Sequence, residues 1–176
     1  MILLKTVEPG QATGSVAQVY SAFDQLGEVP MPMRLLSASP ELQQVQFGGL
    51  RYFGGHKTLN APLLAAIRYA ASELSCHDAC LAFNGSLLQR MGMSAADLEA
   101  LSQGRAPESL EEREAALVVF VRRALSEPAS VSAADLDGLR AQGWTDADIL
   151  DATAHGASLM ASAALQKAFV RGSAAS

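Results

Sequence analysis

Residues 72–84 read Ser-Glu-Leu-Ser-Cys-His-Asp-Ala-Cys-Leu-Ala-Phe-Asn, and this stretch contains both cysteines of the chain and one of its three histidines. An apolar helical pattern ends near Leu74, and a second one begins after Ser75. Ser75 followed by Asp78 is a capping-box pattern that uses Asp in place of the usual Glu. The spacing therefore predicts a helix, a corner near Ser75, and a new helix that begins at Cys76.

The two cysteines are expected on one face of that new helix. Cys76 would occupy its first position, where the positive end of the helix dipole favours a thiolate over a thiol. Cys80 follows one turn later, and thiolates in such positions react with peroxides and disulfides. Cβ atoms four residues apart on a helix lie about 6 Å from each other, whereas a disulfide needs about 3.8 Å. A bridge between the two would therefore require the first turn to unwind.

Helix signals continue on both sides of this segment, and strand signals are nearly absent. The sequence Asn60-Ala61-Pro62 predicts the start of the preceding helix. Four more patterns of the capping-box type predict helix starts: Ser94 with Asp97, Ser109 with Glu112, Ser132 with Asp135, and Thr145 with Asp148. Only residues 2–5 could be extended. We therefore expect an all-α fold, a multi-helix bundle of about nine helices.

Composition limits the classes of partner. The chain has 176 residues, of which 49% are apolar and 18% charged, and its net charge is -5. That balance suits a globular domain that folds without disulfides. Scattered Lys and Arg argue against nucleic-acid binding, and no stretch resembles a membrane span or a secretory signal. We expect a cytoplasmic protein with no nucleic-acid and no membrane partner.

The cysteine segment resembles the signature of the carboxymuconolactone decarboxylase and alkylhydroperoxidase D (AhpD) superfamily, in particular its peroxidase-related branch. That signature is a helix, a Ser/Asn/Gly corner and then Cys-x-x-Cys-x-x-x-His at the start of the next helix, with a glutamate on the helix before. The flanks agree: residues 12–14, 29–30 and 35–42 resemble the amino-terminal arm of that branch, and residues 143–149 resemble the start of its last helix.

The resemblance covers nearly the whole chain and implies its organisation. Residues 1–176 are expected to form a single AhpD-like helical domain. Residues 1–55 would be the amino-terminal helical arm, residues 56–172 the core with the cysteine helix, and residues 173–176 a frayed tail.

The active-site motif departs from the family pattern. The family's second cysteine, its attacking thiol, falls on Cys80. Its first cysteine falls on His77, and Cys76 stands one residue early. Its histidine falls on Asn84 and its glutamate on Ala65. The resemblance therefore implies an attacking thiol that lacks the family's usual disulfide partner and proton-transferring groups.

Neighbouring side chains offer partial substitutes for the missing groups. His77 is three residues from Cys80 and could act as its base or ion-pair partner. Glu73 is nearby but stands at the wrong end of its helix to replace the missing glutamate directly. Asp78 is most simply a helix cap, and a supporting role in the site is the alternative.

Other candidates are more distant in sequence. Arg68 and Tyr69 could line a pocket, although a solvated Arg and a core Tyr are the plainer interpretations. His155 is most simply a hydrogen-bonded core histidine, while the resemblance implies that it lines the pocket. Cys80 itself could be a small buried hydrophobe. A zinc site would need help from His56 or His155, because one helical turn cannot surround a tetrahedral ion, and we expect neither metal nor cofactor.

Three functions remain open. The first is an AhpD-like peroxidase or disulfide reductase with weakened catalysis, an antioxidant type of activity that would use Cys80, Cys76 and His77. Its partners would be a peroxide or organic substrate and a thiol reductant protein. The second is a catalytically degenerate member that binds a small molecule or a partner protein. The third is a carboxymuconolactone decarboxylase-like lactone enzyme with His77 or His155 as acid and base, which an organic acid held by Arg68 would favour.

The last helical pattern indicates self-association. From Ile149 to Val170 the residues are apolar or small almost all the way round the predicted helix. A helix with so little polar surface is normally buried on all sides, and a terminal helix is not easily covered by its own domain. We therefore expect a homo-oligomer, from a dimer to the hexamer that the resemblance implies.

Overall fold

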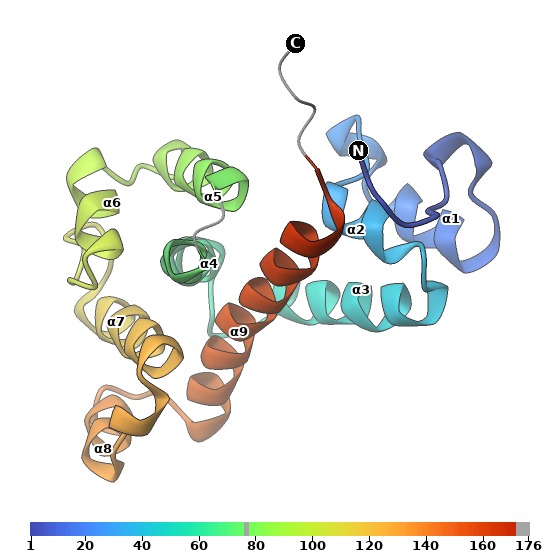
Figure 1. The fold of residues 1–176 in the computed structure, drawn as a ribbon. Coiled ribbons are helices and arrows are strands. Elements are labelled where there is room, and N and C mark those ends of the chain that lie inside the picture. The colour runs from blue at the N-terminus through green and yellow to red at the C-terminus, as the bar shows by residue number, and fades with distance from the viewer. Residues whose placement is uncertain (76–77, 172–176) are drawn as a thin grey trace. The chain divides into compact units, whose positions relative to one another are not determined.

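The computed structural model describes residues 1–75 and 78–171, without the side chain of Ala79, and these residues form an all-α fold (Figure 1). Its helices are α1 (Gly14–Ser21), α2 (Met31–Leu36), α3 (Pro40–Gly54), α4 (Ala61–Leu74), α5 (Asp78–Arg90), α6 (Ala95–Ser102), α7 (Glu112–Ser126), α8 (Ala133–Ala141) and α9 (Asp146–Phe169). The described residues contain no strand beyond an isolated bridge between Ile2 and Val170. The predicted all-α fold of about nine helices is confirmed. None of the helices in the described part is long and apolar enough to cross a membrane.

Cα packing divides the chain into two compact units. One contains Met1–Gly55 together with the chain from Ala164 onward, and the other is His56–Ala163. In the first unit, a small core forms around Val16, Val19, Tyr20 and Met33. The phenol of Tyr20 donates a hydrogen bond of 2.8 Å to the Val7 carbonyl, which fixes the amino-terminal segment to α1. The single domain over residues 1–176 stays a prediction, and its frayed tail lies outside the described residues.

The second unit is built around α4, which packs against α5, α6 and α7 (Figure 1). Most of α4 is buried, including Leu63, Ala65 and Ile67, each at 0% exposure. Its alanines allow neighbouring helices to approach closely. The predicted start of this helix is confirmed, since the Asn60 side chain accepts a hydrogen bond from the Leu63 amide at 2.9 Å.

Most of the predicted helix caps are confirmed. Capping boxes start α6 and α8, and reciprocal hydrogen bonds between Thr145 and Asp148 start α9. The pattern of Ser109 with Glu112 is wrong as a cap, because α7 begins after Glu111 without a side-chain cap. The Ser109 amide instead donates to the carboxylate of Asp97 at 3.3 Å.

The corner between α4 and α5 carries the cysteine segment. Ser75 is the C-cap of α4, and its hydroxyl donates to the Ala71 carbonyl at 2.8 Å. The described part of α5 begins at Asp78. Cys76 and His77 lie outside the described residues, so the predicted helix start at Cys76 stays a prediction.

Candidate functional site

Two residues of α5 face α4 at the candidate site. Cys80 stands in the first described turn and is half-buried, and Asn84, one turn later, is buried at 3% exposure. The side-chain amide of Asn84 donates to the Cys80 carbonyl at 2.8 Å and to the hydroxyl of Ser72 on α4 at 3.5 Å. Ser72 in turn donates to the Arg68 carbonyl at 2.7 Å. These bonds fix the first turns of α5 against the second half of α4.

Arg68 of α4 brings a positive charge to the thiol. Its Nε donates to the Oδ1 of Asn84 at 3.1 Å. Burial lowers the pKa of the Arg68 guanidinium, and its attraction to Cys80 acts in the opposite direction and raises it. None of the described residues accepts a hydrogen bond from the two terminal nitrogens of Arg68. The side chain therefore offers two donor groups near Cys80.

His155 of α9 borders the same charge. It is buried at 6% exposure, and burial, followed by the positive charge of Arg68, lowers its pKa to about 4. A hydrogen bond to the Leu64 backbone partly opposes that shift. At neutral pH the imidazole is therefore uncharged, and Arg68 is the cation of this cluster.

Of the comparisons with known proteins, the one with solved structures supports the architecture. No family model matches the chain, and no curated protein matches its sequence. Solved structures do match it. One is the alkylhydroperoxidase AhpD core of an uncharacterized peroxidase-related protein from Ralstonia eutropha JMP134, with a TM-score of 0.79, 18% identity, and coverage of 98% of this chain and 93% of that one. The chain has the AhpD-like fold.

Two further solved structures are similar over almost the same length. An uncharacterized peroxidase-related protein from Silicibacter sp. TM1040 matches with a TM-score of 0.74 and 17% identity, covering 99% of this chain and 96% of that one. A Cys-to-Ala variant of the debrominase Bmp8, in complex with 2,3,4-tribromopyrrole, matches with a TM-score of 0.73 and 19% identity, covering 95% and 90%. Because the sequence identities are 17–19%, these similarities establish the fold alone.

The AhpD-like fold brings four of the predicted site residues together. Cys80, Asn84, Arg68 and His155 form one polar cluster between α4, α5 and α9. Ser72 belongs to the cluster although the sequence did not single it out. Only its position in the sequence could have indicated this place, because Ser72 stands one turn after Arg68 on an otherwise apolar helix face.

Two other predicted residues lie away from that cluster. Asp78 is exposed and lines a shallow pocket together with Tyr69. Glu73 is half-buried, and its charge acts on Tyr69, whose pKa is raised first by burial and then by this carboxylate. Cys76 and His77 lie outside the described residues, so their roles stay predictions.

His56 has a structural role, because its ring joins two segments of the fold. Its Nδ1 accepts a hydrogen bond from the Leu59 amide at 3.0 Å, and its Nε2 lies 3.2 Å from a carboxylate oxygen of Asp151 on α9. The ring thus ties the loop before α4 to α9. Among the described residues, no group of three or more His, Cys, Asp or Glu side chains could hold a metal ion.

Proposed function

We propose that this chain is an AhpD-like thiol-dependent enzyme that reduces peroxides or disulfides at Cys80, with weakened catalysis. The observation that carries the proposal is Arg68. Arg68 is half-buried, so its guanidinium loses part of its hydration, a cost that an ion pair normally offsets. Arg68 forms no ion pair with a carboxylate of the described residues, and the acidic group that acts on its charge is the thiol of Cys80. A partly desolvated charge near a nucleophile is typical of functional sites.

The charge of Arg68 would act by favouring the thiolate form of Cys80. The thiolate attacks one oxygen of the peroxide, so that an S–O bond forms while the O–O bond breaks. The products are Cys80 sulfenic acid and an alkoxide, which takes a proton from solvent and leaves as the alcohol. A thiol then attacks the sulfenic sulfur, forms a disulfide and releases water. That thiol is either Cys76 or an external dithiol, which finally restores the reduced enzyme.

Asn84 explains why we expect slow turnover. It occupies the position of the family's histidine, and a side-chain amide can orient groups but cannot transfer a proton at neutral pH. General acid–base catalysis contributes typically about 10²–10⁴-fold in rate. The described imidazole of this cluster is the neutral His155, and the charge that acts on it is that of Arg68. A reaction that relies on solvent protons should therefore lack most of that factor.

The same observation favours a second candidate function. The terminal nitrogens of Arg68 have the fork geometry that binds a carboxylate in a bidentate manner. A small organic acid could therefore bind there, either in a degenerate binding protein or in a lactone enzyme of the carboxymuconolactone decarboxylase type. The complex of the debrominase Bmp8 variant with 2,3,4-tribromopyrrole supports an organic molecule as the ligand class in this fold.

The test compares the consumption of an alkyl hydroperoxide, with excess dithiol, by four proteins: the wild type, Cys80→Ser, Cys76→Ser and the double variant. We expect Cys80→Ser to fall to the rate of the double variant. Cys76→Ser should retain a measurable fraction of the wild-type rate, because the dithiol can resolve the sulfenic acid.

A wild-type rate in Cys80→Ser would show that Cys80 is not the nucleophile. If the wild-type rate of peroxide consumption does not exceed the uncatalysed background, binding of a small organic acid at Arg68 becomes the favoured function. Benzoate would then serve as the anionic probe, and Arg68→Gln should abolish its binding.

A further inference from the structure

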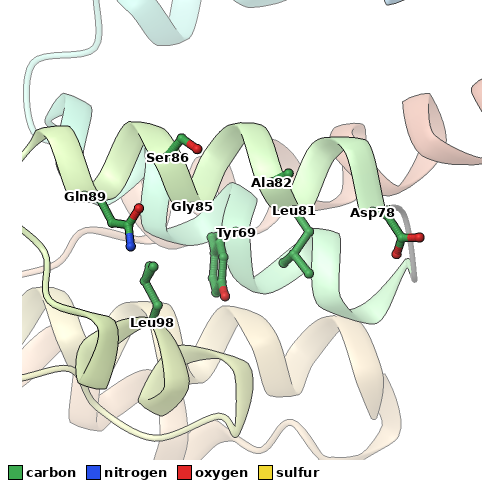
Figure 2. A pocket seen from close by; sticks show the side chains of 8 residues that line it. All are labelled: Tyr69, Asp78, Leu81, Ala82, Gly85, Ser86, Gln89 and Leu98. Carbon is green, nitrogen blue, oxygen red and sulfur yellow. The ribbon is translucent and has the colours of Figure 1, made fainter.

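A shallow pocket of ≈ 340 Å³ lies along one side of α5 (Figure 2). Its lining positions on α5 recur at helical spacing from Asp78 to Gln89, and Cys80 is not among them. Tyr69 of α4 and Leu98 of α6 complete the lining. The pocket is therefore separate from the thiol site, although both are built on the same two helices.

Tyr69 is the central side chain of this pocket. Figure 2 shows its ring between Leu81 and Leu98, beneath Gly85. A Cβ atom at Gly85 would lie 3.2 Å from the Cε2 atom of Tyr69, so any larger residue would push the ring a few tenths of an ångström away from α5. Glycine inside a helix costs roughly 1 kcal/mol relative to alanine. The close approach of the ring accounts for glycine at this position.

The hydroxyl of Tyr69 lacks a hydrogen-bond partner within the part of the chain that the structure describes. The residue is 8% exposed, and no described residue forms a hydrogen bond with its hydroxyl. By contrast, the buried Tyr20 donates to the Val7 carbonyl at 2.8 Å. Tyr69 lines the pocket, and its hydroxyl is not among the buried polar atoms that lack a partner. The hydroxyl is therefore accessible, and a molecule bound in the pocket can form a hydrogen bond with it.

The charges around the pocket are negative. Asp78 stands at one end of the pocket, and the carboxylate of Glu73 acts on the Tyr69 hydroxyl. None of the described lining residues is Lys, Arg or His. Leu81 and Leu98 form apolar walls on either side of the ring (Figure 2). The lining is therefore complementary to a molecule with a cationic group and an apolar body.

We propose that the Tyr69 pocket binds a small organic cation of the primary arylalkylamine class. The ammonium group is attracted by Asp78 and Glu73 and donates a hydrogen bond to the Tyr69 oxygen. The apolar body lies against Leu81 and Leu98. This site does not depend on the chemistry of Cys80, so binding persists in Cys80→Ser.

Three probes of nearly identical shape test the charge preference: 2-phenylethylamine, 2-phenylethanol and phenylacetate. Each is titrated into the isotopically labelled full chain at pH 7, and backbone chemical shifts are followed. The amine should bind most tightly and phenylacetate most weakly. The shifts that move should belong to the pocket face of α5 and to Leu98, not to Asn84 on the opposite face.

Two variants test the named groups. Tyr69→Phe removes only the hydroxyl and should weaken amine binding about 3–10-fold, the range of a single hydrogen bond. Asp78→Asn should weaken binding of the amine and leave the affinity for the alcohol unchanged. The difference in affinity between these two probes should therefore become smaller. Tyr52→Phe and Asp137→Asn make the same changes at exposed positions outside the pocket and should bind like the wild type.

Three outcomes would overturn the proposal. The first is that the amine shows no saturable binding. The second is that amine, alcohol and carboxylate bind alike. The third is that Tyr69→Phe and Asp78→Asn, both folded by circular dichroism, bind the amine as tightly as the wild type.

Discussion

The Nε of Arg68 donates a hydrogen bond to the Oδ1 of Asn84 across 3.1 Å, which joins the helix of Cys80 to the helix before it. Because the oxygen of Asn84 faces a donor and its nitrogen faces the Cys80 carbonyl, both ends of the amide are assigned. In the resemblance described above, Asn84 falls on the position of the signature's histidine. Under our proposal, the fixed positive charge of Arg68 is present at the thiol where the signature has a proton-transferring side chain.

Burial, together with the charge of Arg68, should make folding stability depend on pH through His155. Its pKa falls from 6.5 to about 4 in the folded chain. Below pH 6.5, His155 is protonated in the unfolded chain but stays neutral in the folded chain. The free energy of unfolding therefore decreases as the pH falls from about 6.5 to about 4. The loss should reach up to about 3 kcal/mol.

Urea unfolding between pH 7.5 and pH 4 measures this dependence. His155→Gln can still donate to the Leu64 carbonyl but does not titrate, so it should lose less stability over that interval. Equal slopes for the variant and the wild type would mean that another group is responsible.

Two helical glycines should respond in opposite directions to alanine. In α9, a Cβ at Gly156 would lie 2.7 Å from the Cδ1 of Leu125 and 3.4 Å from Val121, so Gly156→Ala overpacks the core and should cost about 1–3 kcal/mol. In α8, a Cβ at Gly138 meets nothing within 4 Å. Gly138→Ala should therefore stabilise the chain by about 0.5–1 kcal/mol. Thermal unfolding of both variants checks the sign of each change, and a stabilising Gly156→Ala would contradict the packing of α9.

The exposed side of α9 supports our proposal that the chain forms a homo-oligomer. Leu150 is 69% exposed, and Ala154, Ala157 and Ala161 follow it on the exposed side at helical spacing. Such an apolar stripe permits close approach of a second copy. Light scattering should give a mass of at least twice 18.4 kDa at micromolar concentration.

A charged side chain on that stripe should break the assembly. Leu150→Glu is expected to lower the measured mass toward the monomer. Leu26→Glu makes the same change at a position that is 68% exposed outside α9, and should leave the mass unaltered. A wild-type monomer would refute the proposal.

Local patterns predicted the helices well, because the bonds that start a helix lie within a few residues. Asn60 caps the amide of Leu63, and Ser94 and Asp97 cap each other. The prediction failed at Ser109 because its amide is bound by Asp97, twelve residues earlier, and a pattern of four residues carries no information about that contact.

The candidate site was predictable only in part. Resemblance and helical spacing indicated Cys80 and Asn84, since both stand on one segment. Pairing Arg68 with Asn84, and packing Tyr69 against Gly85, depends on how α4 crosses α5. No sequence pattern fixes that crossing, so the charge near the thiol and the position of the Tyr69 phenol emerge only from the packed helices.

The most direct test of the central claim is the pH dependence of alkylation at Cys80, measured by mass spectrometry in the Cys76→Ser background. We predict a midpoint below about 8.5, the ordinary value for a thiol. Arg68→Gln should move the midpoint upward, Arg68→Lys should move it less, and Asn84→Asp should also raise it because a carboxylate neutralises Arg68. A midpoint at or above about 8.5 that stays the same in Arg68→Gln would contradict the claim that Arg68 activates Cys80.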